Sequence, residues 1–380
     1  MNYIGSGEEK TLFDTQFRAR QNRSIDLLSL IMTAQKECGK HPFSIVKDLW
    51  KLRRGAGHLE PYDYFQYKLY DDKKYSEEAR AQFLSEKLHW PITYKCCDQH
   101  YQAITEDKWL SYNFLDRFAV RTPETIAVID QSLRSFGSDT KITSAIELKA
   151  FLKENNFYPV FAKPNLGIGS YGVFIISGID DDIVLLDQSD PATFDDLFEK
   201  VIGTRTYLLQ KFIKNHPVIE AFSPYVATVR LVNLVKPDAV VTPFAVLKIP
   251  SSTNIADNYW RKDNLIADVD FESGVIRRAI RGKGVNLEEI IKHPETGENL
   301  VGQVLPDWQE VIQVNKFCAQ LFAPLRYQSL DIALSSEGPI VVEVNTGCSF
   351  ELPQFASGKG FLTDDVRNFF ESCGWQFQSN

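Results

Sequence analysis

The sequence predicts an α+β protein with three parts. Residues 1–100 form a largely helical N-terminal region, residues 101–207 a small lid subdomain, and residues 208–380 a C-terminal α+β core. Three observations predict this organisation. The chain has 380 residues, more than normally fold around a single hydrophobic core. Apolar residues make up 44% and charged residues 24% of it, as in a folded globular protein. The expected elements change from helices at the start to alternating strands and helices near the end.

Three helices are expected in the N-terminal region. The dense apolar periodicity from Ser24 to Ala34 predicts the first, with Ser24 as its cap. Phe43 to Leu52 is the second, and it runs into the basic run Lys51–Arg54. We interpret that run as a solvated helix end in preference to a phosphate-binding patch. The third helix begins at Ser76-Glu77-Glu78, where a serine precedes acidic residues.

Strands become frequent after residue 150. A helix at 107–118 is followed by two apolar strands, at 157–162 and 172–176, which flank a glycine-rich turn and therefore predict a hairpin. A long helix at 308–322 and a final one at 364–371 follow from their apolar spacing. The β-branched and aromatic runs that predict further strands are 207–212, 226–235, 240–247, 265–269 and 340–344.

Charge and composition exclude several classes of partner. The formal net charge of −8 argues against a nucleic-acid-binding protein, which normally has a basic excess. No apolar run approaches the roughly 20 residues that span a bilayer, and the first ten residues show no signal-peptide core. The six cysteines lack metal-binding spacing, so we expect reduced thiols in a cytoplasmic protein. We therefore expect no nucleic acid and no membrane among its partners.

A first motif with chemical meaning is KPNLGIGSYGV, from Lys163 to Val173. Its glycines, Gly167, Gly169 and Gly172, allow backbone N–H groups to approach anionic oxygens closely, and Ser170 lies among them. Lys163 ends the first strand and can place a positive charge on a phosphate. An ordinary glycine-rich hairpin with a surface lysine fits the motif as well. The motif alone therefore leaves both interpretations open.

A second motif is SLDIALSSEGPIVVEVNTG, from Ser329 to Gly347. Strand alternation places Glu343 and Asn345 on one face, where Asp331 of the neighbouring strand can meet them. Two carboxylates and an amide oxygen are hard ligands suited to Mg²⁺. A surface hairpin with solvated acids is the alternative.

The two motifs, in this order and separation, resemble the ATP-grasp superfamily, and more closely the sugar-transfer-associated ATP-grasp family. The resemblance covers roughly residues 60–365. Four further segments carry it: EDKWLSYNFLDRFAVRTPE, LLQKFIKNHPVIEAFSPYVATVRLVNLV, DNLIADVDFESGVI and HPETGENLVGQVLPDW. It implies an ATP-grasp fold whose C-terminal core binds metal, with ATP and Mg²⁺ as cofactors.

The resemblance also implies roles for single residues on the nucleotide side. Lys108 would contact the α-phosphate side of ATP, and Lys163 would be the second phosphate lysine. The hinge strand, whose backbone hydrogen-bonds adenine, would be formed by Lys211, Phe212 and Ile213. The family commonly has an acid at the start of this hinge, where this chain has Gln210. Glu220 is then a candidate for the ribose.

Further roles concern the reacting groups. Arg230 resembles the arginine that faces the transferring phosphate and the acyl group, although a structural ion pair is an alternative for it. Lys248 stands where related enzymes often have an arginine; it keeps the charge but loses the bidentate fork. Asp331, Glu343 and Asn345 would hold one or two Mg²⁺ ions.

The function implied is that of an ATP- and Mg²⁺-dependent carboxylate ligase. It would activate a carboxylate as an acyl phosphate, captured by an amine or another nucleophile, in the biosynthesis of a small molecule, modified saccharide or peptide-like product. Partners would be small-molecule substrates. A kinase acting on a hydroxyl, formation of an ester or thioester, and a non-catalytic nucleotide-binding module are alternatives. The sequence identifies neither the substrates nor the oligomeric state.

Overall fold

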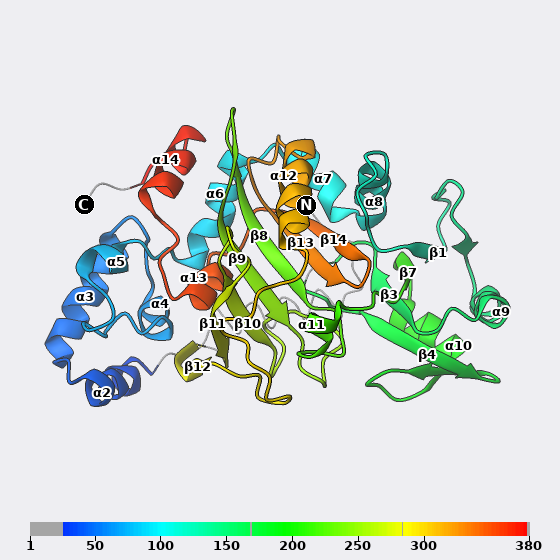
Figure 1. Ribbon diagram of the computed structural model, residues 1–380, viewed down its shortest axis with the longest axis horizontal. Helices are drawn as coiled ribbons and strands as arrows, with labels where there is room; N and C mark the ends of the chain where they lie inside the picture. The colour runs from blue at the N-terminus through cyan, green and yellow to red at the C-terminus, as the bar shows by residue number, and fades with distance from the viewer. Residues whose placement is uncertain (1–25, 168, 283, 378–380) are drawn as a thin grey trace.

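The structure is a computed structural model that describes residues 26–167, 169–282 and 284–377. The expectations for the first ten residues and for Ser24 as a helix cap lie outside these ranges. Two seven-stranded sheets form the framework, and helices surround them (Figure 1). The prediction of an α+β protein is therefore confirmed.

The first sheet is formed between residues 125 and 211 and has the order β2-β1-β7-β3-β4-β5-β6. The pair β1–β2 is parallel and every other neighbouring pair is antiparallel. The antiparallel β3–β4 pair confirms the predicted glycine-linked hairpin. The elements are β1 (Thr125–Ile129), β2 (Lys141–Ile142), α9 (Ala145–Asn155), β3 (Val160–Pro164), β4 (Phe174–Asp180), β5 (Ile183–Leu186), β6 (Ala192–Thr193), α10 (Phe194–Asp196), a π-helix (Leu197–Ile202) and β7 (Tyr207–Lys211).

The second sheet is entirely antiparallel and has the order β12-β11-β10-β9-β8-β13-β14. Strand β13 is buried at every position; it pairs with β8 and β14 along its two edges, and helix α12 packs against it. The long helix α12 packs on β8, β9, β13 and β14. The elements are α11 (Pro217–Glu220), β8 (Thr228–Val235), β9 (Val240–Ile249), β10 (Leu265–Val269), β11 (Ile276–Arg281), β12 (Glu288–Ile290), α12 (Trp308–Leu321), β13 (Tyr327–Ser335), β14 (Gly338–Thr346), α13 (Glu351–Ser357) and α14 (Asp364–Ser372).

The described N-terminal residues are mainly helical, as predicted. Asp26 caps the first helix by accepting a hydrogen bond from the backbone N–H of Ser29. None of the described helices is long and apolar enough to cross a membrane. The helices are α2 (Leu27–Cys38), α3 (Pro42–Arg54), α4 (Pro61–Gln66), α5 (Glu77–Ala81), α6 (His89–Cys96), α7 (Gln99–Glu106) and α8 (Lys108–Asp116), with a 3₁₀ turn (Glu86–Leu88) before α6.

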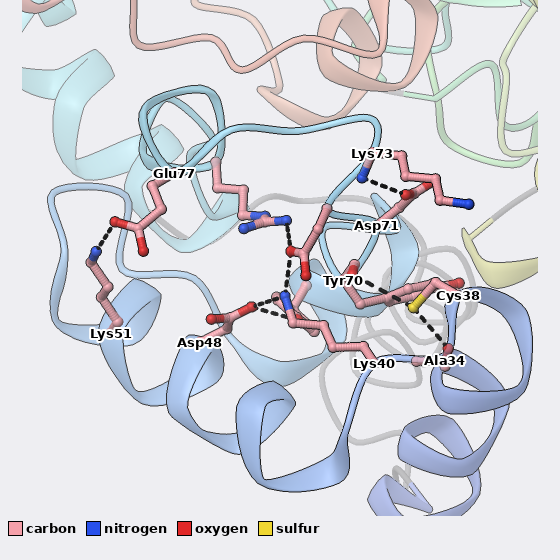
Figure 2. Close-up of polar contacts among 12 residues, drawn as sticks. Ala34, Cys38, Lys40, Asp48, Lys51, Tyr70, Asp71, Lys73 and Glu77 are labelled. Carbon is pink, nitrogen blue, oxygen red and sulfur yellow. Dashed lines mark hydrogen bonds and ion pairs between the residues drawn. The ribbon is translucent and has the colours of Figure 1, made fainter.

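A network of ion pairs ties the first helices together (Figure 2). Lys40 Nζ lies 2.6 Å from Asp48 Oδ2 on α3 and 2.6 Å from Asp72 Oδ1 in the connection to α5. Nearby, Lys51 pairs with Glu77 at 2.5 Å. Both members of this last pair are largely exposed, so it adds little stability. The pairing agrees with a solvated end for helix α3.

Candidate active site

A glycine-rich loop joins β3 to β4 and touches the start of helix α8. Lys108 Nζ donates a hydrogen bond to the carbonyl oxygen of Gly167 at 2.9 Å. Gly169 and Gly172 have φ angles of 71° and 72°, a region that favours glycine. The loop can therefore turn sharply above the sheet and hold its backbone close to a molecule bound beneath it.

The same loop is held from the other side by the connection between β9 and β10. Asn258 Nδ2 donates to the carbonyl oxygen of Gly169 at 2.5 Å. Arg261 donates from Nη2 to the carbonyl oxygen of Ser170 at 2.8 Å. These two side chains bridge the first sheet and the second, so the loop closes over the space between them.

Lys163 lies beneath this loop and is almost completely buried, with 6% of its surface exposed. Its Nζ donates a hydrogen bond to Tyr112 Oη. Burial, and then the nearby charge of Lys108, lower the pKa of Lys163 to about 7, although three carboxylates oppose the shift. A buried lysine with this pKa changes its charge in the physiological range, and an added anion would favour the charged form.

Arg230, Lys248 and Asp331 form one ion-pair cluster on the second sheet. Arg230 on β8 and Asp331 on β13 are directly opposite in the register. The guanidinium donates from Nε and Nη2 to the two carboxylate oxygens at 2.7 and 2.6 Å. Lys248 Nζ, from β9, lies 3.1 Å from Asp331 Oδ2 and 3.1 Å from Asp257 Oδ2. The bidentate pair fixes the orientation of the arginine.

The charged groups in this cluster shift each other's pKa. Burial alone raises the pKa of Asp331, but the charges of Arg230 and Lys248 outweigh it and hold the pKa well below its usual value. The pKa of Arg230 is raised despite its burial, because Asp331 stabilises the cation. Asp331 is therefore ionised, and the alternative of a structural ion pair for Arg230 is consistent with this geometry.

Glu343 and Asn345 lie beside the cluster on β14. Glu343 is opposite Asp331 in the register, and its Oε1 lies 3.2 Å from Lys108 Nζ. The amide nitrogen of Asn345 is buried and has no hydrogen-bond partner within the described residues. This unpaired N–H donor, next to two carboxylates, can bind an acceptor oxygen from outside the chain, whereas a metal ion would bind the amide oxygen. Because both oxygens of Asp331 accept bonds from Arg230 and Lys248, Glu343 and Asn345 are the freer oxygen donors for Mg²⁺.

The predicted hinge follows β7. The amide nitrogen of Gln210 donates to the carbonyl oxygen of Pro123, just before β1, at 3.5 Å and to Oγ1 of Thr125, the first residue of β1, at 3.3 Å. The backbone N–H of Lys211 donates to the carbonyl oxygen of Glu124. Gln210 and the Lys211 N–H thus hold β7 against β1, and Phe212 and Ile213 form the adjoining cavity wall.

These groups surround a single cavity of about 850 Å³. Two predicted residues do not line it: Glu220, which is exposed on α11, and Gly172, which lies at the loop's far end. The structure thus does not bring Glu220 to the cavity. The predicted residues that do line it are Lys108, Lys163, Gly167, Gly169, Ser170, Gln210, Lys211, Phe212, Ile213, Arg230, Lys248, Asp331, Glu343 and Asn345.

Sequence reasoning missed several residues of the cavity wall. Asp257 and Asn258 belong to the irregular connection after β9, whose segment DNYWRKDN combines acids, amides and bases at a density that could have marked it. Tyr112 on α8 lies behind the wall: it accepts a hydrogen bond from Lys163 and donates one to the carbonyl oxygen of Val342 at 2.7 Å. Glu86 and His89 line the cavity from the N-terminal region.

Comparison with known proteins gives a family match. The model of the family described as sugar-transfer associated ATP-grasp matches residues 66–369. No curated protein matches the sequence.

Solved structures are similar at low identity. A D-alanine–D-alanine ligase from Bacillus anthracis has 14% identity and a TM-score of 0.41, over 73% of this chain and 69% of that one. A biotin carboxylase complex from Campylobacter jejuni has 14% identity and a TM-score of 0.38, over 75% and 50%. A D-Ala:D-Ser ligase from Enterococcus faecalis has 12% identity and a TM-score of 0.41, over 72% and 64%. Identities and TM-scores this low carry no argument, so the assignment of the chain to a family rests on the family match alone.

Proposed function

The chain belongs to the sugar-transfer-associated ATP-grasp family, and on this premise we propose that it is an ATP- and Mg²⁺-dependent carboxylate–amine ligase. It activates a small-molecule carboxylate as an acyl phosphate and transfers the acyl group to an amine or another nucleophile. The product is a small molecule, a modified saccharide or a peptide-like compound.

The observation that carries the proposal is the charge of the cavity under the glycine-rich loop. Six lysine and arginine side chains line it, and the four that are not exposed are Lys108, Lys163, Arg230 and Lys248. Three carboxylates, Asp257, Asp331 and Glu343, face them. Lys108, Arg230 and Lys248 each pair with one of these carboxylates, whereas Lys163 forms no ion pair within the described residues. A polyphosphate would supply the anion that Lys163 lacks. Buried cations are costly unless they are paired, so the site is suited to a strongly anionic ligand.

The nucleotide would lie between the two sheets. Its adenine would contact the hinge at Phe212 and Ile213, while the glycine-rich loop covers its phosphates. Lys108 would contact the α-phosphate side and Lys163 the outer phosphates. Small-molecule sites also commonly lie at the interface between two parts of a protein. The ribose then has no acidic partner from Glu220, which lies outside the cavity.

The reaction requires positioning and charge neutralisation more than a side-chain nucleophile. The substrate carboxylate attacks the γ-phosphorus, the bond to the β–γ bridging oxygen breaks, and ADP leaves. Arg230, fixed by Asp331, and Lys248 face the acyl phosphate and stabilise its negative charge. The nucleophile then attacks the acyl carbon and inorganic phosphate leaves.

Magnesium fits the oxygen donors of Glu343 and Asn345, and Asp331 would join them if it gave up its bonds to Arg230 and Lys248. When bound, magnesium would neutralise charge on the phosphate oxygens as phosphoryl transfer proceeds.

Thermal shift with ATP and Mg²⁺ tests the nucleotide part of the proposal. A ligand that binds only the folded protein raises its melting temperature. We expect a rise at millimolar ATP with Mg²⁺, and a smaller one for Glu343→Ala. An unchanged melting temperature for the wild type at millimolar nucleotide would contradict the proposal.

A further inference from the structure

Helix α3 has apolar residues on two opposite faces. On the inner face, Ile45 and Leu52 are buried in the core of the N-terminal region. On the outer face, Phe43, Val46 and Trp50 have exposed fractions of 76%, 50% and 62%. These three residues follow the spacing i, i+3, i+7 and therefore lie on one side of the helix. Large apolar side chains gathered in contact with water are typical of a binding surface.

Basic side chains flank this apolar group. Lys47 and Arg54 follow Phe43 by four and eleven residues, and Arg53 follows Val46 by seven, so all three lie on the same side of the helix. They are exposed, and within residues 26–167, 169–282 and 284–377 none of them forms an ion pair. We call Phe43, Val46, Trp50 and these three basic residues the outer face of α3.

The carboxylates near α3 do not neutralise the outer face. Asp48 is the single acidic residue of the helix, and it accepts hydrogen bonds from Lys40 Nζ at 2.6 Å and from Tyr64 Oη at 3.0 Å (Figure 2). Glu77 pairs with Lys51. The outer face thus keeps three unpaired cations in a chain whose formal net charge is −8. Positive charge is concentrated here against the trend of the whole chain.

A membrane surface with anionic lipids suits this combination of side chains. Exposed aromatic and aliphatic groups on a helix enter the boundary between headgroups and acyl chains, and tryptophan is favoured at that depth. Lysine and arginine beside them bind the lipid phosphates while their apolar stems stay in contact with the membrane. Binding of this kind needs no helix that spans the bilayer, and none of the described helices is long and apolar enough to do so.

Two other occupants bring no negative charge to the outer face. In a two-fold dimer formed through α3, the face would meet its own copy, and its cations would repel each other. Residues 1–25 contain four basic and three acidic side chains, so they do not supply the missing anions either. The charge of the outer face therefore favours a lipid surface over a second copy or the start of the chain.

We propose that the outer face of α3 docks the protein on a membrane surface that contains anionic lipids. Phe43, Val46 and Trp50 enter the headgroup region, and the three cations bind lipid phosphates. None of these residues lines the cavity, so the docking is independent of the proposed ligase reaction. Figure 1 shows α3 at one end of the molecule and the first sheet at the other. The proposal replaces the expectations of no membrane partner and of a merely solvated basic run.

The test is co-sedimentation of the full chain with lipid vesicles. One set of vesicles is phosphatidylcholine alone, and the other is equal parts of phosphatidylcholine and phosphatidylglycerol. We expect the protein to sediment with the mixed vesicles only, and the bound fraction to fall as sodium chloride is added, because salt screens the attraction. A protein that stays in the supernatant with the mixed vesicles, or that binds both sets equally, overturns the proposal.

Two sets of substitutions separate the apolar contribution from the charge. Phe43→Ser combined with Trp50→Ser should weaken vesicle binding by roughly tenfold or more, because two buried rings are lost from the bound state. Replacing Lys47, Arg53 and Arg54 by glutamine should weaken it roughly fivefold for each charge removed and should reduce its salt dependence. Both variants should keep the melting temperature of the wild type, since these side chains are exposed.

Helix α9 provides the matched control. Ile146 is 81% exposed, and Lys149 and Lys153 follow it at the same side of the helix, but they pair with Asp182 and Asp181. Ile146→Ser with both lysines replaced by glutamine should bind vesicles like the wild type. Equal losses from the α3 and α9 variants contradict the role of the outer face.

Light scattering and thermal shift complete the test. A wild-type dimer that Phe43→Ser with Trp50→Ser separates, without vesicle binding, would assign the outer face to a second copy and overturn the proposal. Thermal shift with ATP and Mg²⁺ is recorded for the same samples. A protein that binds the nucleotide but no vesicles refutes this inference alone, whereas one that binds vesicles but no nucleotide refutes the proposed function alone.

Discussion

Substitution of Lys163 by methionine should remove a pH dependence from nucleotide binding. In the ligand-free protein, burial and the charge of Lys108 lower the pKa of Lys163 to about 7. A nucleotide phosphate beside Nζ would favour the protonated form, so the complex would keep the proton to higher pH. Raising the pH through 7 therefore removes the proton from the free protein first, and binding must then restore it.

The size of the effect follows from the lowered pKa. With a pKa of about 7, the protonated fraction of Lys163 falls from about 0.9 at pH 6 to about 0.1 at pH 8, which weakens phosphate binding roughly tenfold, or by about 1.4 kcal/mol. Folding stability has the opposite trend. An unfolded lysine has a pKa of about 10.4, so the unfolded chain binds more protons above pH 7. The free energy of unfolding of the ligand-free protein should rise from about pH 7 to 10, and this contribution is lost as the pH falls through 7.

The assay is isothermal titration calorimetry with ADP and Mg²⁺ between pH 6 and 8. Lys163→Met is the control, because it reports the titration of the nucleotide and of every other group. The ratio of the two dissociation constants, variant over wild type, should decrease about tenfold across this range. A constant ratio would show that Lys163 keeps one charge state throughout, and the reasoning from its burial would be wrong.

Three further predictions concern the ion pairs, the backbone and the loop. Asp331→Ala should abolish ADP release and cost roughly 3–5 kcal/mol in urea denaturation, because it leaves the buried Arg230 unpaired and Lys248 with Asp257 alone. Glu343→Ala should abolish turnover with a much smaller loss, and equal losses would contradict the burial argument. Gly57→Ala should lower the free energy of unfolding by about 1–3 kcal/mol or more, since the added Cβ would lie 1.9 Å from a backbone oxygen. Gly178→Ala is the control and should be nearly neutral, because its Cβ would lie 3.6 Å from the nearest atom. Similar melting temperatures for the two variants would refute this. Asn258→Ala should speed proteolysis in the glycine-rich loop, and added ATP should slow cleavage in the wild type; cleavage that neither change affects would refute a closing loop.

The sequence was most informative where a single local pattern decides the geometry. The glycine-rich run between two apolar strands predicted the β3–β4 hairpin, because turn residues and strand alternation act over a few positions. Alternation likewise predicted that Asp331 and Glu343 face each other across β13 and β14. Helix α12 was predicted within one residue, because its apolar spacing follows one helical face.

Other features depend on contacts between distant segments. Asp257 meets Lys248 only because an irregular connection folds back over β9, and irregular segments have no periodicity to detect. The pattern around Asp331 showed the face of its side chain but not its partners, so the pairing with Arg230 had to come from the structure. Glu220 was a candidate for the ribose because Gln210 stands where the family commonly has an acid, but it is exposed on helix α11 and does not line the cavity.

The most direct test of carboxylate activation follows an oxygen atom. Once a substrate is found, its carboxylate is labelled with ¹⁸O, and the inorganic phosphate released during turnover is examined by mass spectrometry. If the carboxylate attacks the γ-phosphorus, one labelled oxygen must leave with the phosphate when the nucleophile displaces it. We predict ¹⁸O in the released phosphate. A phosphorylated product with no free phosphate would contradict the ligase and identify a kinase.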